Sequence, residues 1–382
     1  MATDRVSTVQ ARLKRIVNAM SAQLAHIRDI GPVGYYGPLF GEVPDSDYWV
    51  LTGRERSRHL ADKVSASLAS TGTPSYFVDA ANDLGHFRLL TPKDRVLLFH
   101  RRGEPTNRLL RLLRAIPDTV PLDVITDHPE GWPRKPGVLL PVVAPDPLAP
   151  EVERDIISLA IGDSLVCGLE SAREFTEVEF LKDHPKGSLG KSIAAAQPEG
   201  KAGAVKYLPP PEQAFAALAD ERDAVRALLD TLDSAAVSGW LDLFNRPWTR
   251  IITTGMGKPG YCLRYLTVLL GEVGKPAFYL HPAEGVHGDL GRIGPNSLVV
   301  AYSHSGETEE VLSILPRIKE RGATLISLTN NPESSLGRAS DAVLKSGAPE
   351  VDPIRKAPTG STTASLAFMT ALACADLPVK PS

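Results

Sequence analysis

Residues 298–311 combine an apolar run with a cluster of hydroxyl side chains, in the order LVVAYSHSGETEEV. The first five residues are typical of a buried strand, and the apolar spacing from Val311 onward is typical of a helix. Ser303, Ser305 and Thr308 lie in the turn between them. Because a helix start offers unpaired backbone N–H groups, three added hydroxyls favour a phosphate-binding turn. An ordinary capped turn, the alternative, needs only one hydroxyl.

Length and composition limit the classes of protein to consider. The chain has 382 residues, of which 43% are hydrophobic, enough for two domains with large cores. The net charge of −3 and the lack of a long basic run argue against a nucleic-acid or membrane-surface partner. Three dispersed cysteines show no metal spacing and suggest a reducing compartment, so we expect a cytoplasmic protein without metal or cofactor. The N-terminal residues lack the apolar core of a signal peptide, and no stretch is long enough to span a bilayer.

The second half of the sequence repeats the first. Gly103 of HRRGEPT and Gly306 of SHSGET are 203 residues apart, as are Leu122 of LDVITDHPE and Leu325 of LISLTNNPE. Expected strands cover 49–51, 75–78, 95–99, 122–126 and 138–143, and then 250–254, 277–280, 298–302, 325–328 and 342–345. Helical patterns alternate with them. We therefore predict two tandem three-layer α/β/α domains, each with a five-stranded parallel sheet of flavodoxin-like type.

This pattern also locates the functional edge. The predicted domains cover residues 1–194 and 213–382, joined by a Pro- and Gly-rich linker over 195–212. Ligands of open α/β sheets bind at the carboxyl ends of the strands. In the second domain the GMGK turn (255–258), the hydroxyl-rich turn and the loop before the last helix all fall there. We expect the active site at this edge.

Five segments resemble the sugar isomerase (SIS) domain family, and most closely its arabinose-5-phosphate isomerases. They are GMGKPG (255–260), HPAEGVHGDLG (281–291), SHSGET (303–308), TNNPESSLGRASD (329–341) and APTGSTTA (357–364).

The resemblance covers nearly all of the second half. In the first half it is confined to scattered pieces and to residues 173–193, which resemble the tail that follows such a domain. It implies a degenerate first SIS domain and a second one that carries the active site.

The resemblance also implies an aldose–ketose isomerase that interconverts ribulose 5-phosphate and arabinose 5-phosphate. The positions that match the family's catalytic residues are Lys258, His287, Glu307, Glu350 and His184. Substrate phosphate would be bound by Ser303, Ser305, Thr308, Gly257, Ser361 and Thr362.

Such an isomerase moves a proton between C1 and C2 through an enediolate, which needs a base, an oxyanion-stabilising group and a proton shuttle. Glu307 and Glu350 are the candidate bases, and we prefer Glu350. Lys258 suits enediolate or phosphate stabilisation, and His184 and His287 suit the shuttle. Each also has an ordinary structural interpretation: Lys258 as a solvated cation, Glu307 as a helix-start acid, His287 as a structural or metal-binding side chain and His184 as a loop residue.

The first copy lacks this set. Arg56 stands where the second copy has its lysine, and Arg101 and Arg102 replace the Ser-x-Ser pair, while Glu104 and Thr106 are retained. We interpret this half as a pseudo-domain with a structural or site-completing role. The alternative is a different anion site formed by Arg54, Arg56, Arg101 and Arg102.

These observations lead to one hypothesis about how the site is assembled and to two alternatives for the function. The hypothesis is an intramolecular pseudo-dimer whose first copy lends its tail, with His184, to the site on the second copy. We expect a homodimer of such chains. The charged loop at 350–356, Pro259 and His304 depart from the family pattern, so the substrate could be a heptose, hexulose or aminosugar phosphate. The other alternative is a non-catalytic sugar-phosphate-binding protein.

Overall fold

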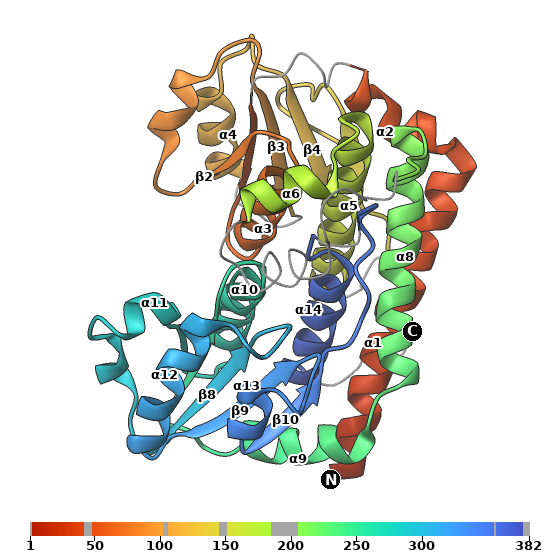
Figure 1. Ribbon diagram of the computed structural model, residues 1–382. Coiled ribbons are helices and arrows are strands. Elements are labelled where there is room, and N and C mark those ends of the chain that lie inside the picture. Colours follow the sequence, from red (N-terminus) through yellow and green to blue (C-terminus); the bar gives the residue numbers. More distant parts are fainter. Residues whose placement is uncertain are drawn as a thin grey trace. The chain divides into compact units, whose positions relative to one another are not determined.

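In the computed structural model the described residues are 2–41, 48–101, 106–144, 151–184, 205–354 and 357–376. They form two five-stranded sheets in which every strand pair is parallel (Figure 1), so the predicted fold class is confirmed. The chain divides into two compact units, one made of Met1–Val17, Asp223–Pro349 and Gly360–Ser382 and the other of Asn18–Arg222 and Glu350–Thr359. Each unit contains one sheet and is described by itself.

The second of these units contains sheet A, with strand order β2-β1-β3-β4-β5. Its strands are β1 (Trp49–Gly53), β2 (Ser75–Asp79), β3 (Arg95–His100), β4 (Leu122–Thr126) and β5 (Leu139–Pro141). Its other elements are α2 (Pro32–Phe40), α3 (Ser57–Ser70), the 3₁₀ helix η2 (Leu84–Leu89), α4 (Thr106–Ala115), α5 (Glu151–Ala172) and α6 (Glu177–Asp183). All five strands were predicted, and no predicted strand end differs from the observed one by more than two residues.

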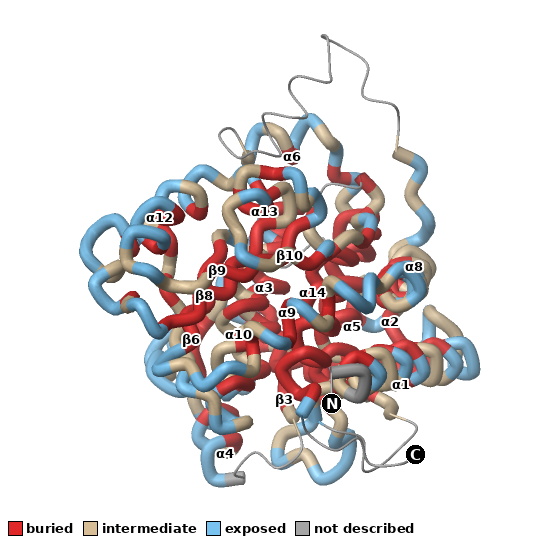
Figure 2. Tube along the Cα trace, turned by 90° about the horizontal axis from the view of Figure 1, so that it is seen from below, coloured by how far each residue is buried: buried red, intermediate tan, exposed pale blue. Residues whose placement is uncertain are grey.

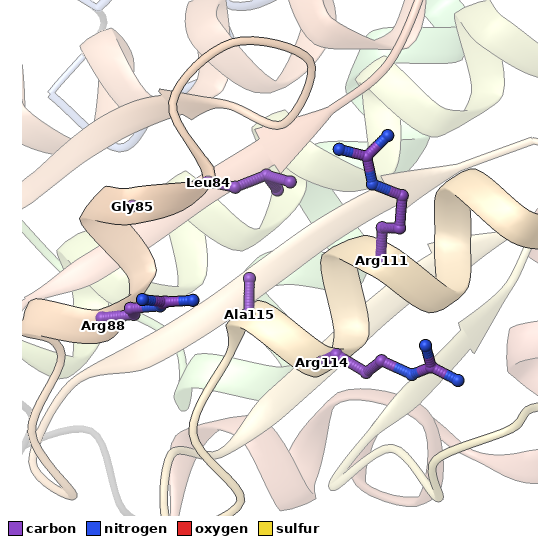
Figure 3. Close-up of a pocket in the computed structure, with 6 residues that line it drawn as sticks. All are labelled: Leu84, Gly85, Arg88, Arg111, Arg114 and Ala115. Atoms are coloured by element: carbon purple, nitrogen blue, oxygen red, sulfur yellow. The ribbon is translucent and has the colours of Figure 1, made fainter.

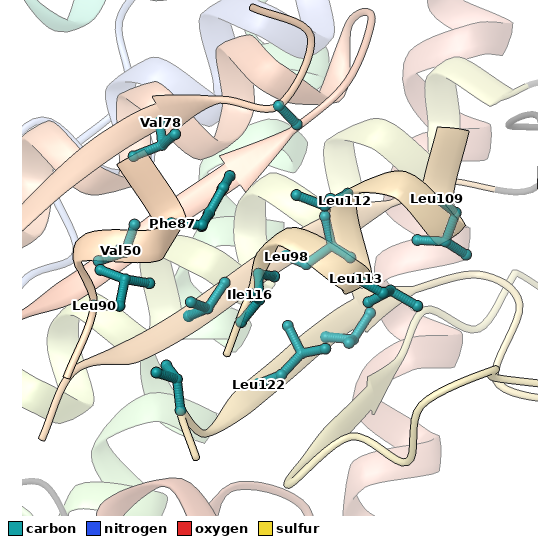
Figure 4. Packing of buried hydrophobic residues seen from close by; sticks show 14 residues of the cluster. Val50, Val78, Phe87, Leu90, Leu98, Leu109, Leu112, Leu113, Ile116 and Leu122 are labelled. Atoms are coloured by element: carbon teal, nitrogen blue, oxygen red, sulfur yellow. The ribbon is translucent and has the colours of Figure 1, made fainter. Parts of the chain in front are cut away.

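Helices cover both faces of sheet A. On one face Phe87 of η2 and Leu112 of α4 pack against valines and leucines of the strands (Figure 4). On the other face α3 packs against α5. Gly162 of α5 permits this close approach, because a Cβ there would lie 2.7 Å from Val64 and 2.9 Å from Phe99. Alternate strand residues thus point into two cores, which gives three layers.

The unit of sheet B repeats this arrangement with strand order β10-β9-β8-β6-β7. Its strands are β6 (Arg250–Gly255), β7 (Ala277–Tyr279), β8 (Ser297–Tyr302), β9 (Thr324–Thr329) and β10 (Ala342–Lys345). Its other elements are α9 (Ser234–Phe244), α10 (Lys258–Glu272), α11 (Pro282–Gly285), η3 (Asp289–Arg292), α12 (Glu309–Glu320), α13 (Ser335–Ala339) and α14 (Gly360–Ala373). Helices α11 and α12 lie on one side of the sheet, and α10 and α14 lie on the other (Figure 1). Every residue of α14 is buried, as is every residue of the central strand β8 (Figure 2).

The two copies also share details of local structure. Thr126, which ends β4, accepts a hydrogen bond from the N–H of His128 at 3.0 Å, and Thr329, which ends β9, accepts one from the N–H of Asn331 at 3.3 Å. In both copies a threonine hydroxyl therefore turns the chain away from the sheet two residues later. This agreement supports the duplication inferred from the sequence.

Several elements depart from the sequence-based expectation. The Gly/Pro-rich connection after residue 30 contains α2, because Pro32 sits at the helix start, where a proline costs no hydrogen bond, and Tyr35 and Tyr36 are buried. Helix α8 (Pro210–Asp230) begins inside the expected linker, and residues 195–204 of that linker lie outside the described residues. The unit boundaries fall within α1 (Ala2–Ile30) and within α8, and the domain limits drawn from the sequence remain a prediction. Among the described residues, none of the helices is long and apolar enough to cross a membrane.

A buried ion pair joins α3 to α5 behind sheet A. Lys63 Nζ lies 2.5 Å from Asp163 Oδ2, and both side chains are almost fully buried. Two charges removed from water are tolerated here because each supplies the counter-charge of the other.

We predict that Lys63→Met destabilises the protein by about 3–5 kcal/mol, because it leaves a carboxylate buried without its cation. The double variant Lys63→Met/Asp163→Leu should recover much of that loss, since no buried charge remains. Chemical denaturation of the three proteins measures both effects. Equal free energies of unfolding for the single and double variants would contradict this account.

Candidate functional site

The order of strands in sheet B reverses between β6 and β8. These strands are hydrogen-bonded neighbours, but the chain runs from β6 through α10 to β7 on one side and from β8 through α12 to β9 on the other. The N-termini of α10 and α12 therefore meet beside the same pair of strand ends. Such a reversal is where open α/β sheets bind ligands, and helix N-termini favour anions.

The GMGK turn links β6 to α10. A Cβ on Gly255 would lie 2.8 Å from the carbonyl oxygen of Tyr302, so glycine allows the ends of β6 and β8 to approach. Gly257 precedes the helix with φ of +62°, a conformation that favours glycine, and forms no side-chain cap. Lys258 is the first residue of α10 and is partly exposed. Lys258 thus lies just beyond the carboxyl end of β6, as predicted.

The sequence analysis missed an aromatic support for this turn. The hydroxyl of Tyr279, at the end of β7, donates to the carbonyl oxygen of Gly255 at 2.5 Å. The Arg264 guanidinium lies over the rings of Tyr279 and Tyr261, 4.8 and 5.6 Å from their centroids. Burial raises the pKa of Tyr279, which keeps its hydroxyl protonated as a donor. A tyrosine at a strand's carboxyl end was the available signal.

The hydroxyl-rich turn between β8 and α12 is organised by its own side chains. The hydroxyl oxygens of Ser303 and Thr308 are 2.7 Å apart, and that of Ser303 also accepts from the N–H of Gly306 at 3.1 Å. The Ser305 hydroxyl accepts from the N–H of Glu307 at 3.2 Å. Thr308 directly precedes α12 but forms no side-chain cap, so its hydroxyl does not occupy the first N–H groups of that helix. The three hydroxyls of this turn that were predicted to bind phosphate thus lie at one helix start.

Only glycine fits at position 306 of this turn. Gly306 has φ of +72°, and a Cβ there would lie 1.9 Å from the Ser334 hydroxyl oxygen. Backbone conformation and space both require glycine. The turn is therefore fixed against the segment that leads into α13.

Glu307 forms a hydrogen bond with the start of a neighbouring helix, α13. Its side chain is exposed, and its Oε1 accepts a hydrogen bond of 2.8 Å from the N–H of Ser335, the first residue of α13. This bond lowers the pKa of Glu307. A carboxylate held in its ionised form is a weaker base, so the geometry favours a positioning role for Glu307.

The start of α14 lies at the same edge. The Ser365 hydroxyl donates to that of Tyr302 at 2.9 Å, and the Cys262 thiol of α10 donates to the carbonyl oxygen of Thr362 at 3.9 Å. These contacts place the hydroxyl-rich first turn of α14, with buried Ser361 and Thr362, beside β8 and α10. The three predicted segments therefore converge.

His287 lies on the periphery of this arrangement. It is exposed in the turn between α11 and η3, after β7, which is the edge strand of sheet B. Among the described residues, no hydrogen bond of the structure joins its ring to the GMGK turn or to the hydroxyl-rich turn.

The loop that carries Glu350 belongs to the unit of sheet A. Glu350 Oε2 accepts from the N–H of Thr359 at 2.9 Å, which closes the loop immediately before α14. Ile354 and Ala357 pack with Phe175 and Phe180 of the tail after α5. The loop and the tail thus share one hydrophobic cluster.

His184 ends the described part of that tail. It directly follows α6, and its ring stacks on Phe180 at 4.0 Å between centroids and an interplanar angle of 12°. Its Nδ1 lies 2.8 Å from the carbonyl oxygen of Phe180. These contacts fix the orientation of the ring.

Two buried carboxyl groups support the same loop. Glu170 of α5 and Asp352 are both 0% exposed, and Glu170 Oε1 accepts from the N–H of Ile354 at 3.2 Å. Burial, assisted by the charge of Asp352, raises the pKa of Glu170 to about 9. Glu170 is therefore protonated at neutral pH. The charged loop that departs from the family pattern thus places its aspartate inside the unit, beside a neutral carboxyl.

Comparison with known proteins identifies the second half of the chain. Residues 246–375 match the model of the SIS domain family. This segment is therefore similar to SIS domains. The chain is 42% identical over 156 residues to an arabinose 5-phosphate isomerase, KdsD, of Pseudomonas aeruginosa. That alignment covers 41% of this chain and 48% of the relative, so the chain spans about half the length of the curated relatives that it matches.

Solved structures extend the likeness of fold to the whole chain. The C-terminal domain of glucosamine-fructose-6-phosphate aminotransferase from Francisella tularensis superposes with a TM-score of 0.61 at 14% identity, over 97% of this chain and 96% of that one. A tagatose-6-phosphate ketose/aldose isomerase from Escherichia coli superposes with a TM-score of 0.60 at 17% identity, over 98% and 96%. At these identities the likeness shows the two-sheet fold alone.

The corresponding edge of sheet A differs from that of sheet B. Arg56, which follows β1, lies 3.0 Å from Asp155, and Arg101, which follows β3, lies 2.6 Å from Glu151 and 2.5 Å from Glu55. Internal carboxylates therefore hold the cations that stand in place of the lysine and the hydroxyls. This pairing argues against the alternative anion site at this edge.

The remaining residues of the alternative anion site give it little further support. Arg54 donates to the carbonyl oxygen of Ala80 at 3.5 Å. Arg102, Glu104 and the side chain of Thr106 lie outside the described residues.

The raised pKa of Glu170 leads to a pH-dependent prediction. The folded protein holds a proton that the unfolded chain releases above its ordinary pKa of 4.5, so stability should fall as pH rises from about 4.5 to about 9. Glu170→Gln keeps the acceptor oxygen and removes the titration. We expect similar melting temperatures for wild type and variant near pH 5 and a higher value for the variant near pH 9.

Glu179→Gln is the matched control for this measurement. Glu179 is an exposed carboxyl of the same tail, and its pKa is lowered by hydrogen bonds from Thr176, so it stays ionised between pH 5 and 9. It should leave the alkaline slope unchanged. An equal slope in wild type and Glu170→Gln would show that Glu170 does not carry this proton.

Proposed function

We propose that the chain is a phosphosugar aldose–ketose isomerase of the ribulose 5-phosphate/arabinose 5-phosphate type, with one active site per chain. The observation that carries the proposal is the convergence of the GMGK turn, the hydroxyl-rich turn and the start of α14 at the strand reversal of sheet B. The 42% identity to an arabinose 5-phosphate isomerase falls in the same half of the chain. It supports the choice of substrate class.

The substrate phosphate would lie at the N-terminus of α12. Ser303, Ser305 and Thr308 supply hydroxyl donors there, and the first N–H groups of the helix supply more. Gly257, Ser361 and Thr362 would complete this site from the neighbouring turn and from α14. Because a phosphate held at one point leaves the sugar extended, the chain length of the sugar determines which carbons reach the catalytic groups.

The catalytic roles rest on the match to the family's motifs. Glu350 takes the proton from C2 of the aldose and returns it to C1 through the enediolate, and Lys258 stabilises the negative oxygen of that intermediate. His184 and His287 carry protons between the sugar oxygens. Glu307 fixes the phosphate turn against α13, in agreement with its lowered pKa.

A different sugar phosphate is the second candidate. Two substitutions in the matched segments favour it: Pro259 is the second residue of α10, directly after the catalytic lysine, and His304 lies inside the hydroxyl-rich turn. A cytoplasmic location and a homodimer of such chains are parts of the same proposal.

The test is solvent deuterium exchange. Wild-type protein incubated in D₂O with arabinose 5-phosphate should exchange the C2 proton, followed by proton NMR, and should form ribulose 5-phosphate. Glu350→Gln should slow both processes by about 100-fold or more, because a positioned general base contributes about 10²–10⁴ to the rate.

The control is Glu320→Gln, which removes an exposed carboxylate from the C-terminal end of α12, away from the proposed phosphate, and should leave both rates near the wild-type value. Exchange with a hexose or heptose phosphate instead of the pentose would favour the second candidate. Binding of every sugar phosphate without exchange would contradict catalysis.

A further inference from the structure

The unit of sheet A has a groove on its helical face. The groove has a volume of about 470 Å³ and lies between η2 and α4 (Figure 3). Its lining residues are Leu84, Gly85, Arg88, Arg111, Arg114 and Ala115. It belongs to the helix layer between β2 and β4 and is separate from the strand ends where Arg56 and Arg101 are paired with carboxylates.

The groove is positively charged. Half of its lining residues are arginines, none is acidic, and all three arginines are exposed. Figure 3 shows Arg88 extending from η2 toward Ala115, while Arg111 and Arg114 project from successive turns of α4. A ligand along the groove would therefore meet cationic groups at more than one point.

These arginines differ from several others of their unit. Arg95 pairs with Asp123, Arg101 with Glu151 and Arg154 with Asp127. Within the described part of the chain, no ion pair or hydrogen bond of the structure engages the guanidinium groups of Arg88, Arg111 or Arg114. Their charge remains available to an external anion.

The sequence of α4 places like charges together. Arg108, Arg111 and Arg114 recur at intervals of three, and the helix has no acidic residue in its first turn or elsewhere. Like charges at this spacing oppose helix formation by about 0.2–0.5 kcal/mol per pair. An anion bound at Arg111 and Arg114, the two of these arginines that line the groove, would offset the repulsion between them.

The base of the groove is apolar and firmly packed. Leu84 and Ala115 pack against the core cluster of sheet A, and Leu112, Leu113 and Ile116 anchor α4 in it (Figure 4). The arginines therefore extend from a fixed helix, which limits the entropy lost when they bind a ligand. The apolar base offers contact to an organic group.

We propose that this groove binds a small organic oligophosphate, such as a nucleoside di- or triphosphate. The planar guanidinium group matches phosphate oxygens in bidentate geometry, and three arginines match the charge of two or three linked phosphates. The volume lies in the range of about 300–1,000 Å³ that is usual for small-molecule sites. A groove of this volume favours a small molecule over an acidic protein segment. The inference goes beyond the proposed isomerase, whose substrate phosphate lies at the edge of sheet B.

Calorimetric titration of the full chain tests this proposal, with ATP and inorganic tripolyphosphate as probes. We expect both to bind with an affinity that falls as salt is raised, and ATP to bind more tightly because its base and sugar contact Leu84 and Ala115. The double variant Arg111→Gln/Arg114→Gln should lose at least tenfold in affinity. Arg108→Gln, one turn away on the same helix, is the matched control and should change it by less than twofold.

Four outcomes would overturn the proposal. The first is the absence of binding of either probe at millimolar concentration. The second is equal affinity in wild type and the double variant while the melting temperatures show that both are folded. The third is loss of binding in Ser305→Ala, which would place the phosphates in the proposed substrate site. The fourth is a glutamate-rich peptide that binds more tightly than both probes, which would identify an acidic partner instead.

Discussion

The fold depends on one topological constraint, the reversal of strand order between two neighbouring parallel strands. At that point the chain leaves the two strands in opposite directions, so two helices begin side by side and present unpaired N–H groups to the same space. In sheet B that space is bordered by the hydroxyl-rich turn, the GMGK turn and the start of α14. In sheet A carboxylates of the protein itself pair with the arginines found there. One duplicated topology thus carries the proposed phosphate site in one copy and an internal ion-pair network in the other.

Much of this could be predicted because it depends on local patterns. Apolar runs bounded by glycine and proline gave all ten strands, and the constant spacing between the copies gave the duplication. The hydroxyl-rich turn could be recognised because Ser303, Ser305 and Thr308 are close in sequence as well as in space. Helix α2 was missed because its Gly- and Pro-rich composition is typical of a loop, whereas burial of Tyr35 and Tyr36 stabilises it as a helix.

The features that could not be predicted depend on distant contacts. The position of Tyr279 at the end of a strand was visible in the sequence, but its hydrogen bond to the carbonyl oxygen of Gly255 was not. Nor does any local pattern show that Glu170 accepts a hydrogen bond from the backbone of Ile354, 184 positions away. The same holds for the pKa of Glu170, which depends on how deeply two carboxyl groups are buried together. The sequence showed the position of Glu307 in the turn, but it did not show the hydrogen bond that Glu307 accepts from α13. The sequence thus located the candidate residues, and the tertiary structure shows their hydrogen bonds, their burial and the direction of their pKa shifts.

The central claim is that only the edge of sheet B binds the sugar phosphate. Peptide-resolved hydrogen exchange with and without arabinose 5-phosphate tests it most directly, since both edges are observed in one experiment. The account predicts slower exchange in peptides that cover Gly255–Lys258 and Ser303–Thr308, and no change in the peptide that covers Gly53–Ser57. Protection of Gly53–Ser57 to the same extent, or protection of neither edge by any sugar phosphate, would contradict it.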